Sequence, residues 1–371
     1  MPGIEVETPA MLDARRDMEV CNACRYCEGY CAVFPAMELR RDFTSGDLNY
    51  LANLCHGCQG CFYACQYAPP HEFGINVPQA LARVRNESYA QYAWPDPLAA
   101  AYRRNGLVTS LAMAGGIVGV LLLALLVQGG GVSFSAHPVV PGRGFYDVVP
   151  YGAMVWVASV TFGFSMVALG VGFVRFWRDV GGTAEGLRDG RGWRQALHDA
   201  ATLKYLGGGG HGCNDVSEAF STGRRHLHHA MAYGFLLCFA STSVATVYDH
   251  GFGWAAPYAF WSVPVLLGTA GGIGLMVGTA GLLGMKLRAD QEPRARELLG
   301  AEAGLLVLLF LLGFTGLLLL AVRATGAMGV VLTVHLGLVL ALFVTLPYGK
   351  FVHGVYRLGA LLRHAGERPG A

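Results

Sequence analysis

Long apolar stretches dominate the chain after residue 106, whereas the first hundred residues are polar and contain no comparable stretch. A helix needs about 20 apolar residues to cross the hydrocarbon core of a bilayer. So many stretches of that length in succession are improbable in the core of a soluble domain. The pattern predicts six membrane-spanning helices, at residues 107–128, 149–177, 229–248, 256–283, 303–322 and 328–352.

Composition supports a division of the chain into two parts. The 371 residues are 53% hydrophobic and only 14% charged, which is more apolar than a soluble domain of this length. The first segment, MPGIEVETPAMLDARRDMEV, lacks the apolar centre of a signal peptide. We therefore expect a cytoplasmic domain at residues 1–100 and a six-span membrane domain at residues 101–371.

Basic residues in the loops orient the predicted helices, because Lys and Arg are enriched in cytoplasmic loops. One side of the predicted bundle carries only Arg143 and Arg323. The other side, which includes both termini, carries Arg103, Arg104, Arg175, Arg178, Arg188, Arg191, Arg194, Lys204, Arg224, Arg225, Lys286, Arg288, Arg294, Arg296, Lys350, Arg357, Arg363 and Arg368. Both termini are therefore expected in the cytoplasm. The basic residues are not gathered into a nucleic-acid-binding patch, so we expect no nucleic-acid partner.

Two cysteine runs share one spacing. CNACRYCEGYC at residues 21–31 and CHGCQGCFYAC at residues 55–65 both follow C-x2-C-x2-C-x3-C, and together they use eight of the ten cysteines. In two-cluster ferredoxins the fourth cysteine of each run ligates the other cluster. The spacing predicts two [4Fe–4S] clusters, the first held by Cys21, Cys24, Cys27 and Cys65 and the second by Cys55, Cys58, Cys61 and Cys31.

Three other uses of the cysteines fit this pattern less well. Disulfides need an oxidising compartment, whereas this segment is expected in the cytosol. Structural zinc usually takes two separated CxxC pairs, and buried structural cysteines would not follow this spacing. Ala32 and Gln66 stand where the bacterial ferredoxin pattern has proline, and the sequence between the runs has a helical pattern. We expect a helical dicluster ferredoxin-like domain and an all-α fold for the chain.

Histidines recur in or beside the predicted membrane helices, where ionisable residues are costly and usually functional. His335 and His353 are 18 residues apart, which is five whole turns and about 27 Å along one helix. His228 and His229 lie at the inner end of the third predicted helix, and His250 lies at its outer end. Antiparallel packing would bring His228 or His229 to His353, and His250 towards His335.

Two histidines on facing helices are what a six-coordinate haem b requires. On the inner side we favour a haem held by His229 and His353, with His228 as another candidate ligand. On the outer side, His250 and His335 are candidates for a second haem. There we favour the alternative, in which they are interfacial histidines without a cofactor.

Three basic residues and two glycine-rich segments are further candidates for a role in cofactor binding or in packing. Arg224, Arg225 and Lys350 lie at the depth of the inner histidines, where they either pair with haem propionates or serve only as anchors at the membrane surface. The loop LKYLGGGGHGC at residues 203–213 is either a flexible linker or a segment that brings His211 and Cys213 against a partner or against the domain of residues 1–100, named here the cluster domain. The small residues of GTAGGIGLMVGTAGLLG at residues 268–284 predict close helix packing.

Several of these motifs carry a resemblance to a known family. The doubled cysteine runs, the LGGGGHGC loop, RRHLHHAMAYGFLLCFASTSVATVYDH at residues 224–250 and VHLGLVLALFVTLPYGKFVHGVYR at residues 334–357 resemble the tricarballylate/citrate utilisation protein B family. The resemblance implies a multi-pass protein of the bacterial inner membrane that reoxidises a cytosolic FAD-dependent dehydrogenase. In that family the dehydrogenase oxidises tricarballylate to cis-aconitate. The membrane half is also similar to the haem-b subunit of respiratory nitrate reductase, where one helix carries a His-x17-His pair.

The expected function is electron transfer. Electrons from a reduced flavin on the partner would pass through the two clusters and haem b to the quinone pool. This sequence carries no visible flavin or nucleotide motif, which agrees with a separate dehydrogenase. Two alternatives stay open. One is a subunit that oxidises quinol and delivers electrons to a cytosolic reductase of the heterodisulfide-reductase-like type. The other is a membrane redox sensor whose clusters recruit a partner.

Overall fold

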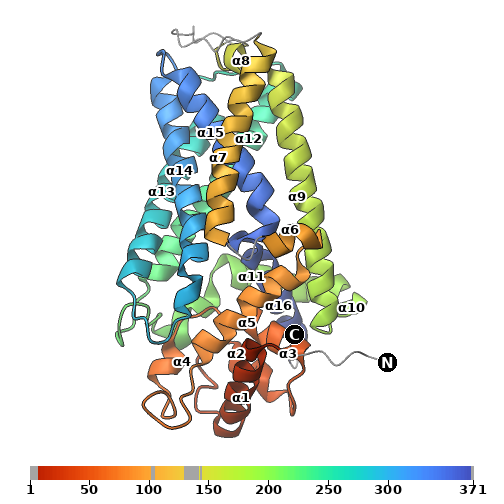
Figure 1. The fold of residues 1–371 in the computed structure, drawn as a ribbon, viewed down its shortest axis with the longest axis vertical. Helices are drawn as coiled ribbons and strands as arrows, with labels where there is room; N and C mark the ends of the chain where they lie inside the picture. The colour runs from red at the N-terminus through yellow and green to blue at the C-terminus, as the bar shows by residue number, and fades with distance from the viewer. Residues whose placement is uncertain (1–6, 102–104, 129–141, 143, 369–371) are drawn as a thin grey trace.

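The computed structural model describes residues 7–101, 105–128, 142 and 144–368, and within these residues it contains many helices and no strand. The predicted all-α fold is confirmed: a small helical domain lies at one end of a bundle of long helices (Figure 1). Arg103, Arg104 and Arg143, which were used to orient the bundle, lie outside the described residues.

The N-terminal domain contains α1 (Pro9–Cys24), α2 (Val33–Glu38), α3 (Ser45–Leu54), α4 (Gly60–Tyr63) and α5 (Val77–Tyr92). Thr8 caps α1 by accepting a hydrogen bond from the Met11 N–H (3.3 Å), and α1 ends where Arg25 adopts a left-handed backbone conformation (φ 56°). Thr44 and Asp47 form a capping box at the start of α3, and this helix ends at Leu54 because Cys55 adopts an extended conformation (φ −66°, ψ 123°). Both cysteine runs therefore begin at a helix end.

Within the residues that the structure describes, six helices are long and apolar enough to cross a membrane, as the sequence predicts. They are α7 (Asn105–Val127), α9 (Tyr151–Asp179), α12 (Gly223–Phe252), α13 (Val263–Arg288), α14 (Leu299–Val322) and α15 (Met328–Thr345). Shorter helices connect or follow them: α6 (Asp96–Ala101), α8 (Phe145–Val148), α10 (Ala184–Arg188), α11 (Gly190–Ala201), η2 (Lys204–Gly210), η3 (Arg296–Leu298), η4 (Leu346–Tyr348), η5 (Lys350–Val352) and α16 (His353–Gly366). The chain is thus a multi-pass membrane protein.

The last predicted span differs from the structure. It is not one helix: α15 ends at Thr345, two short 3-10 turns follow, and α16 begins at His353. Pro347 has no N–H to continue the helix, and Gly349 is extended (φ −121°, ψ −172°). His335 and His353 therefore lie on different helices, and the expected five-turn alignment between them does not form.

Close packing of α12 against α13 uses the glycines that the sequence marks. A Cβ on Gly278 would lie 2.4 Å from the backbone nitrogen of Met231, and one on Gly234 would lie 2.5 Å from that of Leu275. Both distances are shorter than any real contact, so only glycine fits at these two positions. The contact fixes the rotation of α12, which carries three of the five candidate haem ligands.

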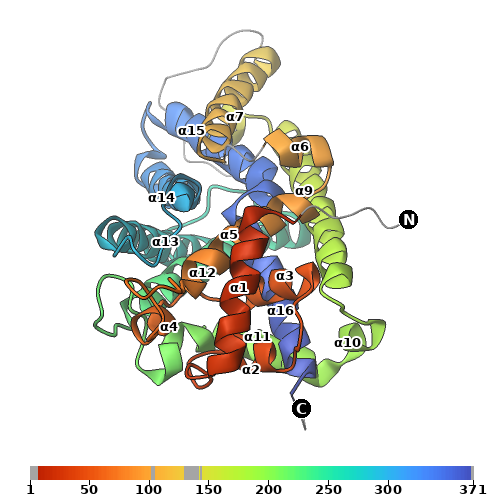
Figure 2. The same ribbon diagram turned by 60° about the horizontal axis from the view of Figure 1, so that its bottom comes forward.

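The C-terminal helix belongs to the core of the N-terminal domain. Tyr356 and Leu361 of α16 are buried together with Phe34 and Leu51 of the cluster domain and with Phe176 near the C-terminal end of α9. Figure 2 shows α16 beside α3 and α11 beneath the bundle. The cluster domain is therefore built partly from segments more than 300 residues further along the chain.

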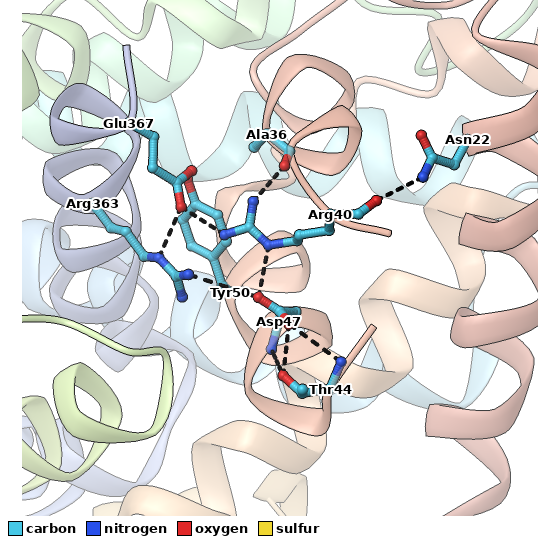
Figure 3. Close-up of polar contacts among 8 residues, drawn as sticks. All are labelled: Asn22, Ala36, Arg40, Thr44, Asp47, Tyr50, Arg363 and Glu367. Carbon is cyan, nitrogen blue, oxygen red and sulfur yellow. Dashed lines mark hydrogen bonds and ion pairs between the residues drawn. The ribbon is translucent and has the colours of Figure 1, made fainter. Parts of the chain in front are cut away.

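A network of charged side chains joins the same parts (Figure 3). The Arg40 side chain is 8% exposed and donates to Asp47 (2.7 Å) and to Glu367 (2.6 Å). Glu367 also accepts hydrogen bonds from Tyr50 (2.9 Å) and Arg363 (3.0 Å). This network ties the end of α16 to α2 and α3.

Candidate redox cofactor sites

The eight cysteines of the two runs line two separate cavities. One cavity, named here the first cluster site, is lined by Cys21, Cys24, Cys27 and Cys65. The other, the second cluster site, is lined by Cys31, Cys55, Cys58 and Cys61. These are the two sets that the crossed assignment names. Among the described residues no three His, Cys, Asp or Glu side chains converge closely enough to hold a single metal ion, whereas a cubane spreads its ligands around a larger body.

The first cluster site lies near the surface of the N-terminal domain. Its cysteines are half-buried, and neighbouring Tyr26 is 69% exposed. Burial, together with the Cys65 thiol, raises the pKa of Cys27 to about 12. Such thiols keep their protons unless a cation takes their place, so iron binding is coupled to proton release. This site is accessible to a partner in solution.

The second cluster site lies deeper, towards the membrane helices. Cys55 and Cys58 are 8% and 7% exposed. Burial, and then the thiols around it, raise the pKa of Cys61 well above its usual value. The Cys55 carbonyl accepts hydrogen bonds from Arg85 (2.8 Å) and Arg357 (2.7 Å). Cationic side chains thus contact the backbone of this site directly.

The glycine-rich loop packs against the second cluster site. Cys213 is fully buried in one apolar cluster with Cys58, and the Asn214 N–H donates to the Cys58 carbonyl (2.9 Å). A left-handed Gly212 (φ 112°) lets the chain turn back, since a Cβ there would lie 2.5 Å from the Ser221 carbonyl oxygen. The structure therefore places Cys213 against the second cysteine run, whereas the exposed His211 ring lies beside Phe220.

One histidine pair meets across the bundle. The rings of His228, on α12, and His353, at the start of α16, have centroids 6.2 Å apart and planes at 85°. Metal–imidazole bonds are about 2 Å long, so two rings on opposite sides of one metal ion have centres roughly 6 Å apart. His353 Nδ1 is hydrogen-bonded to the Lys350 carbonyl, which leaves Nε2 as the ring atom available to a ligand. Burial, and then Arg357, lower the pKa of His353 well below its usual value, so its ring is neutral.

The other candidate histidines have different partners. His229 hydrogen-bonds through Nε2 to the Ala201 carbonyl (3.1 Å). His250 meets the Tyr151 hydroxyl (2.6 Å), and His335 Nδ1 meets the Thr315 hydroxyl (2.9 Å). The structure therefore brings His228, rather than His229, to His353, and it gives the two outer histidines separate neighbours on α9 and α14.

A cavity of about 650 Å³ lies between the second cluster site and the membrane helices. His56 and Gly57 of the second cysteine run form part of its wall, and His228 and His353 form another part. Leucines of α12, α13 and α14 line its membrane side: Leu236, Leu282, Leu305 and Leu306. Its size lies in the range of small-molecule and cofactor sites, and its wall combines apolar and basic groups, which suits a porphyrin with anionic propionates.

Two arginines connect the histidine pair to the second cysteine run. Arg224 lies one helical turn before His228 and donates to the carbonyls of Gly57 (2.7 Å) and His56 (3.1 Å). Arg357 lies one turn after His353 and bonds the Cys55 carbonyl, as described above. From the sequence, Arg357 is counted only as a topology signal, and Arg224 as either a partner of haem propionates or an anchor at the membrane surface. Their four-residue spacing from the histidines, which places each pair on one helix face, was the available signal.

The other suggested propionate partners already have contacts. Lys350 donates to Glu302 (2.6 Å), and Lys286 donates to the same carboxylate; all three line the large cavity. Arg225 donates instead to the Thr202 carbonyl (2.8 Å). Lys350 thus faces the cavity, whereas Arg225 does not line it.

The chain is similar to known proteins over nearly its whole length. The family model for citrate utilization protein B matches residues 100–371, and the model for the citrate utilization protein B Fer4-like domain matches residues 14–91. Citrate utilization protein B of Escherichia coli is 48% identical over 365 residues, which cover 98% of this chain and 94% of that relative. The chain belongs to the citrate utilization protein B family. Its predicted family is thereby confirmed, and its N-terminal domain is Fer4-like. No solved structure matches the chain.

Proposed function

We propose that the chain is a membrane-bound electron-transfer protein of citrate or tricarballylate utilisation. It reoxidises a cytosolic FAD-dependent dehydrogenase of the tricarballylate dehydrogenase type and passes the electrons to the quinone pool. Two [4Fe–4S] clusters, held by the two four-cysteine sets, and one haem b carry the electrons. The protein makes and breaks no substrate bonds itself.

One observation carries the proposal: a single cavity is lined both by the second cysteine run and by the His228–His353 pair. Electron transfer between protein-bound cofactors needs them to lie close together, and this cavity adjoins the second cluster site. The separation of the two rings, the Nε2 of His353 that its Nδ1 bond to Lys350 leaves available, the unpartnered buried Nδ1 of His228 and the basic wall all fit a haem b held by both histidines. When bound, the haem supplies a one-electron carrier at the inner end of the bundle.

The residues of the chain have separate tasks in this proposal. The exposed first cluster site faces the partner, and the second cluster site faces the membrane domain. Arg224 and Arg357 hold the Cys55–Cys58 backbone against the two histidine-bearing helices. The leucines of α12–α14 exclude water from the membrane side of the cavity.

The proposed location is the bacterial inner membrane, with the cluster domain and both termini in the cytoplasm. The distribution of Lys and Arg supports this orientation. It also places the thiols in a reducing compartment, where they stay available for iron.

The test is a reconstitution in detergent or liposomes with the flavoprotein, its substrate and a soluble quinone. We expect the flavoprotein with tricarballylate or citrate-derived acids to bleach the cluster absorption, and added quinone to restore it at enzyme-like rates. Reduction by quinol but not by the flavoprotein would favour the quinol-oxidising alternative. Cofactor reduction without steady quinone turnover would favour a sensor.

A further inference from the structure

Buried positive charge is concentrated at the second cluster site. Arg85 is 8% exposed and donates to the carbonyls of Ala52 (3.0 Å) and Cys55 (2.8 Å). Arg357 donates to the carbonyls of Asn53 (3.3 Å) and Cys55 (2.7 Å). Within the described residues neither arginine forms an ion pair with a carboxylate. Two uncompensated charges therefore lie against the Cys55 loop.

The first cluster site lacks such charges in the described part of the chain. Arg25 donates to the Asn22 carbonyl (3.0 Å), but its side chain is exposed, so water and salt screen it. The buried ionisable group nearby is acidic: Asp17 is 2% exposed and lies one turn before Cys21 on α1. Its ion pair with surface-exposed Arg16 (3.1 Å) offsets its charge only in part.

Arg224 is a useful comparison at the second cluster site. It contacts the same loop through the His56 and Gly57 carbonyls, but it is paired with Asp215 (2.9 Å). Its net electrostatic effect is therefore smaller than that of Arg85 or Arg357.

Reduction makes a cluster more negative, so nearby positive charge stabilises the reduced form and raises the reduction potential. Burial by itself acts in the opposite direction, because the more negative form loses hydration. The burial of Arg85 and the partial burial of Arg357 limit the water that would screen the two charges, and charge interactions strengthen as the local dielectric falls. The second cluster site has two unpaired cations, and the first has a buried carboxylate. The effect of these charges on the difference in reduction potential therefore outweighs the effect of burial.

We propose that the second cluster has the higher reduction potential, set by Arg85 and Arg357, so that electrons move from the first cluster to the second. In this step the first cluster is oxidised by one electron and the second is reduced by one, with no bond or proton change. The inference rests on the proposed function, since both clusters must assemble. It adds the relative reduction potentials of the two clusters and the two side chains that set them.

The experiment is a potentiometric titration of the full-length protein followed by electron paramagnetic resonance. A water-soluble lanthanide chelate assigns the signals in the unmodified protein, because it speeds relaxation of the exposed cluster more than of the buried one. We expect the exposed cluster to titrate at the lower potential. Arg357→Gln, which keeps hydrogen-bond donors but loses the charge, should lower the potential of the buried cluster, whereas Arg357→Lys should not.

Further variants keep the test decisive. Arg85→Gln should act like Arg357→Gln if the latter fails to assemble, and Arg225→Gln should shift neither signal because that side chain bonds Thr202 instead. A higher potential for the exposed cluster would overturn the inference. If the buried cluster has the same reduction potential in Arg357→Gln and Arg357→Lys, the charge of this side chain does not set that potential. Absence of both cluster signals would overturn the proposed function as well, which distinguishes the two failures.

Discussion

Adjacent histidines on α12 have different surroundings, and this difference decides which of them can serve a cofactor. A helix turns by 100° per residue, so His228 and His229 cannot face the same neighbour. The sequence predicted that one of them would lie near His353. It could not show which one, because the rotation of α12 depends on its contact with α13 at Gly234 and Gly278.

The haem ligands are tested by three alanine variants. We expect His228→Ala and His353→Ala to lose the bound haem, because each removes one of the two axial nitrogens. The His229→Ala variant loses only a hydrogen bond to the Ala201 carbonyl, so it should retain the bound haem. The measurement is haem content and the low-spin absorption spectrum of the purified protein. Loss of haem in His229→Ala but not in His228→Ala would reverse the assignment.

Crossed cluster ligation predicts a remote effect of a single cysteine. Cys65→Ser should change the resonance signal of the cluster at Cys21, Cys24 and Cys27, although Cys65 belongs to the other run. Cys31→Ser should change the second signal in the same way. Electron paramagnetic resonance of the reduced variants checks this. A Cys65→Ser change confined to the second signal would refute the crossed arrangement.

At the scale of the elements, the six long helices could be predicted because their apolar stretches are much longer than a soluble core requires. The residues at which these helices begin and end could not be predicted from the sequence. The third span begins six residues earlier than expected, at Gly223, because the basic and histidine-rich first turns of α12 lie against the cluster domain and η2. The sixth ends early because Pro347 and Gly349 interrupt it.

Helix packing gives a matched pair of glycine variants on α13. Gly278→Ala places a Cβ 2.4 Å from the Met231 nitrogen, so we expect it to destabilise the protein by about 1–3 kcal/mol, as overpacking does. Gly284→Ala meets nothing within 4 Å and should be neutral or stabilise by up to about 1 kcal/mol. Thermal unfolding in detergent measures both. Equal midpoints for the two variants would show that α12 and α13 are not so closely packed.

For the whole molecule, the two-part organisation could be predicted from composition, but the shared core could not. The tail after Val352 carries charged residues and was read as a topology signal. Its apolar face, with Tyr356 and Leu361, fills the core of the cluster domain. Such contacts join residues more than 300 positions apart, and no local pattern reveals them.

The Arg40–Asp47–Glu367 network predicts how docking of the cluster domain responds to acid. Burial raises the pKa of Asp47, but hydrogen bonds from Thr44 and Arg40 outweigh it, so the net pKa lies below the usual 3.8. A lowered pKa means stability that is present above the unfolded-state value and lost as pH falls through the folded-state value. The contribution of this carboxylate should therefore be constant at neutral pH, begin to fall below about pH 4 and be lost as the pH drops through the lowered pKa of Asp47.

Asp47→Asn should remove this contribution at every pH and cost about 1–3 kcal/mol, since it leaves Arg40 with one carboxylate fewer. Exposed Asp42→Asn is the matched control. Limited proteolysis of the N-terminal domain between about pH 2 and 7, with a protease active in acid at the low end, measures docking. Equal protection of the Asp42 and Asp47 variants would contradict a stabilising role for the network.

The central claim is a relay of two clusters and one haem, and the iron and haem content per chain tests it most directly. The protein should be purified anaerobically from membranes in detergent. The account predicts about nine iron atoms per chain, eight in two cubanes and one in haem b. About eight iron atoms without haem would contradict the relay, since electrons would then have to leave the second cluster directly to quinone.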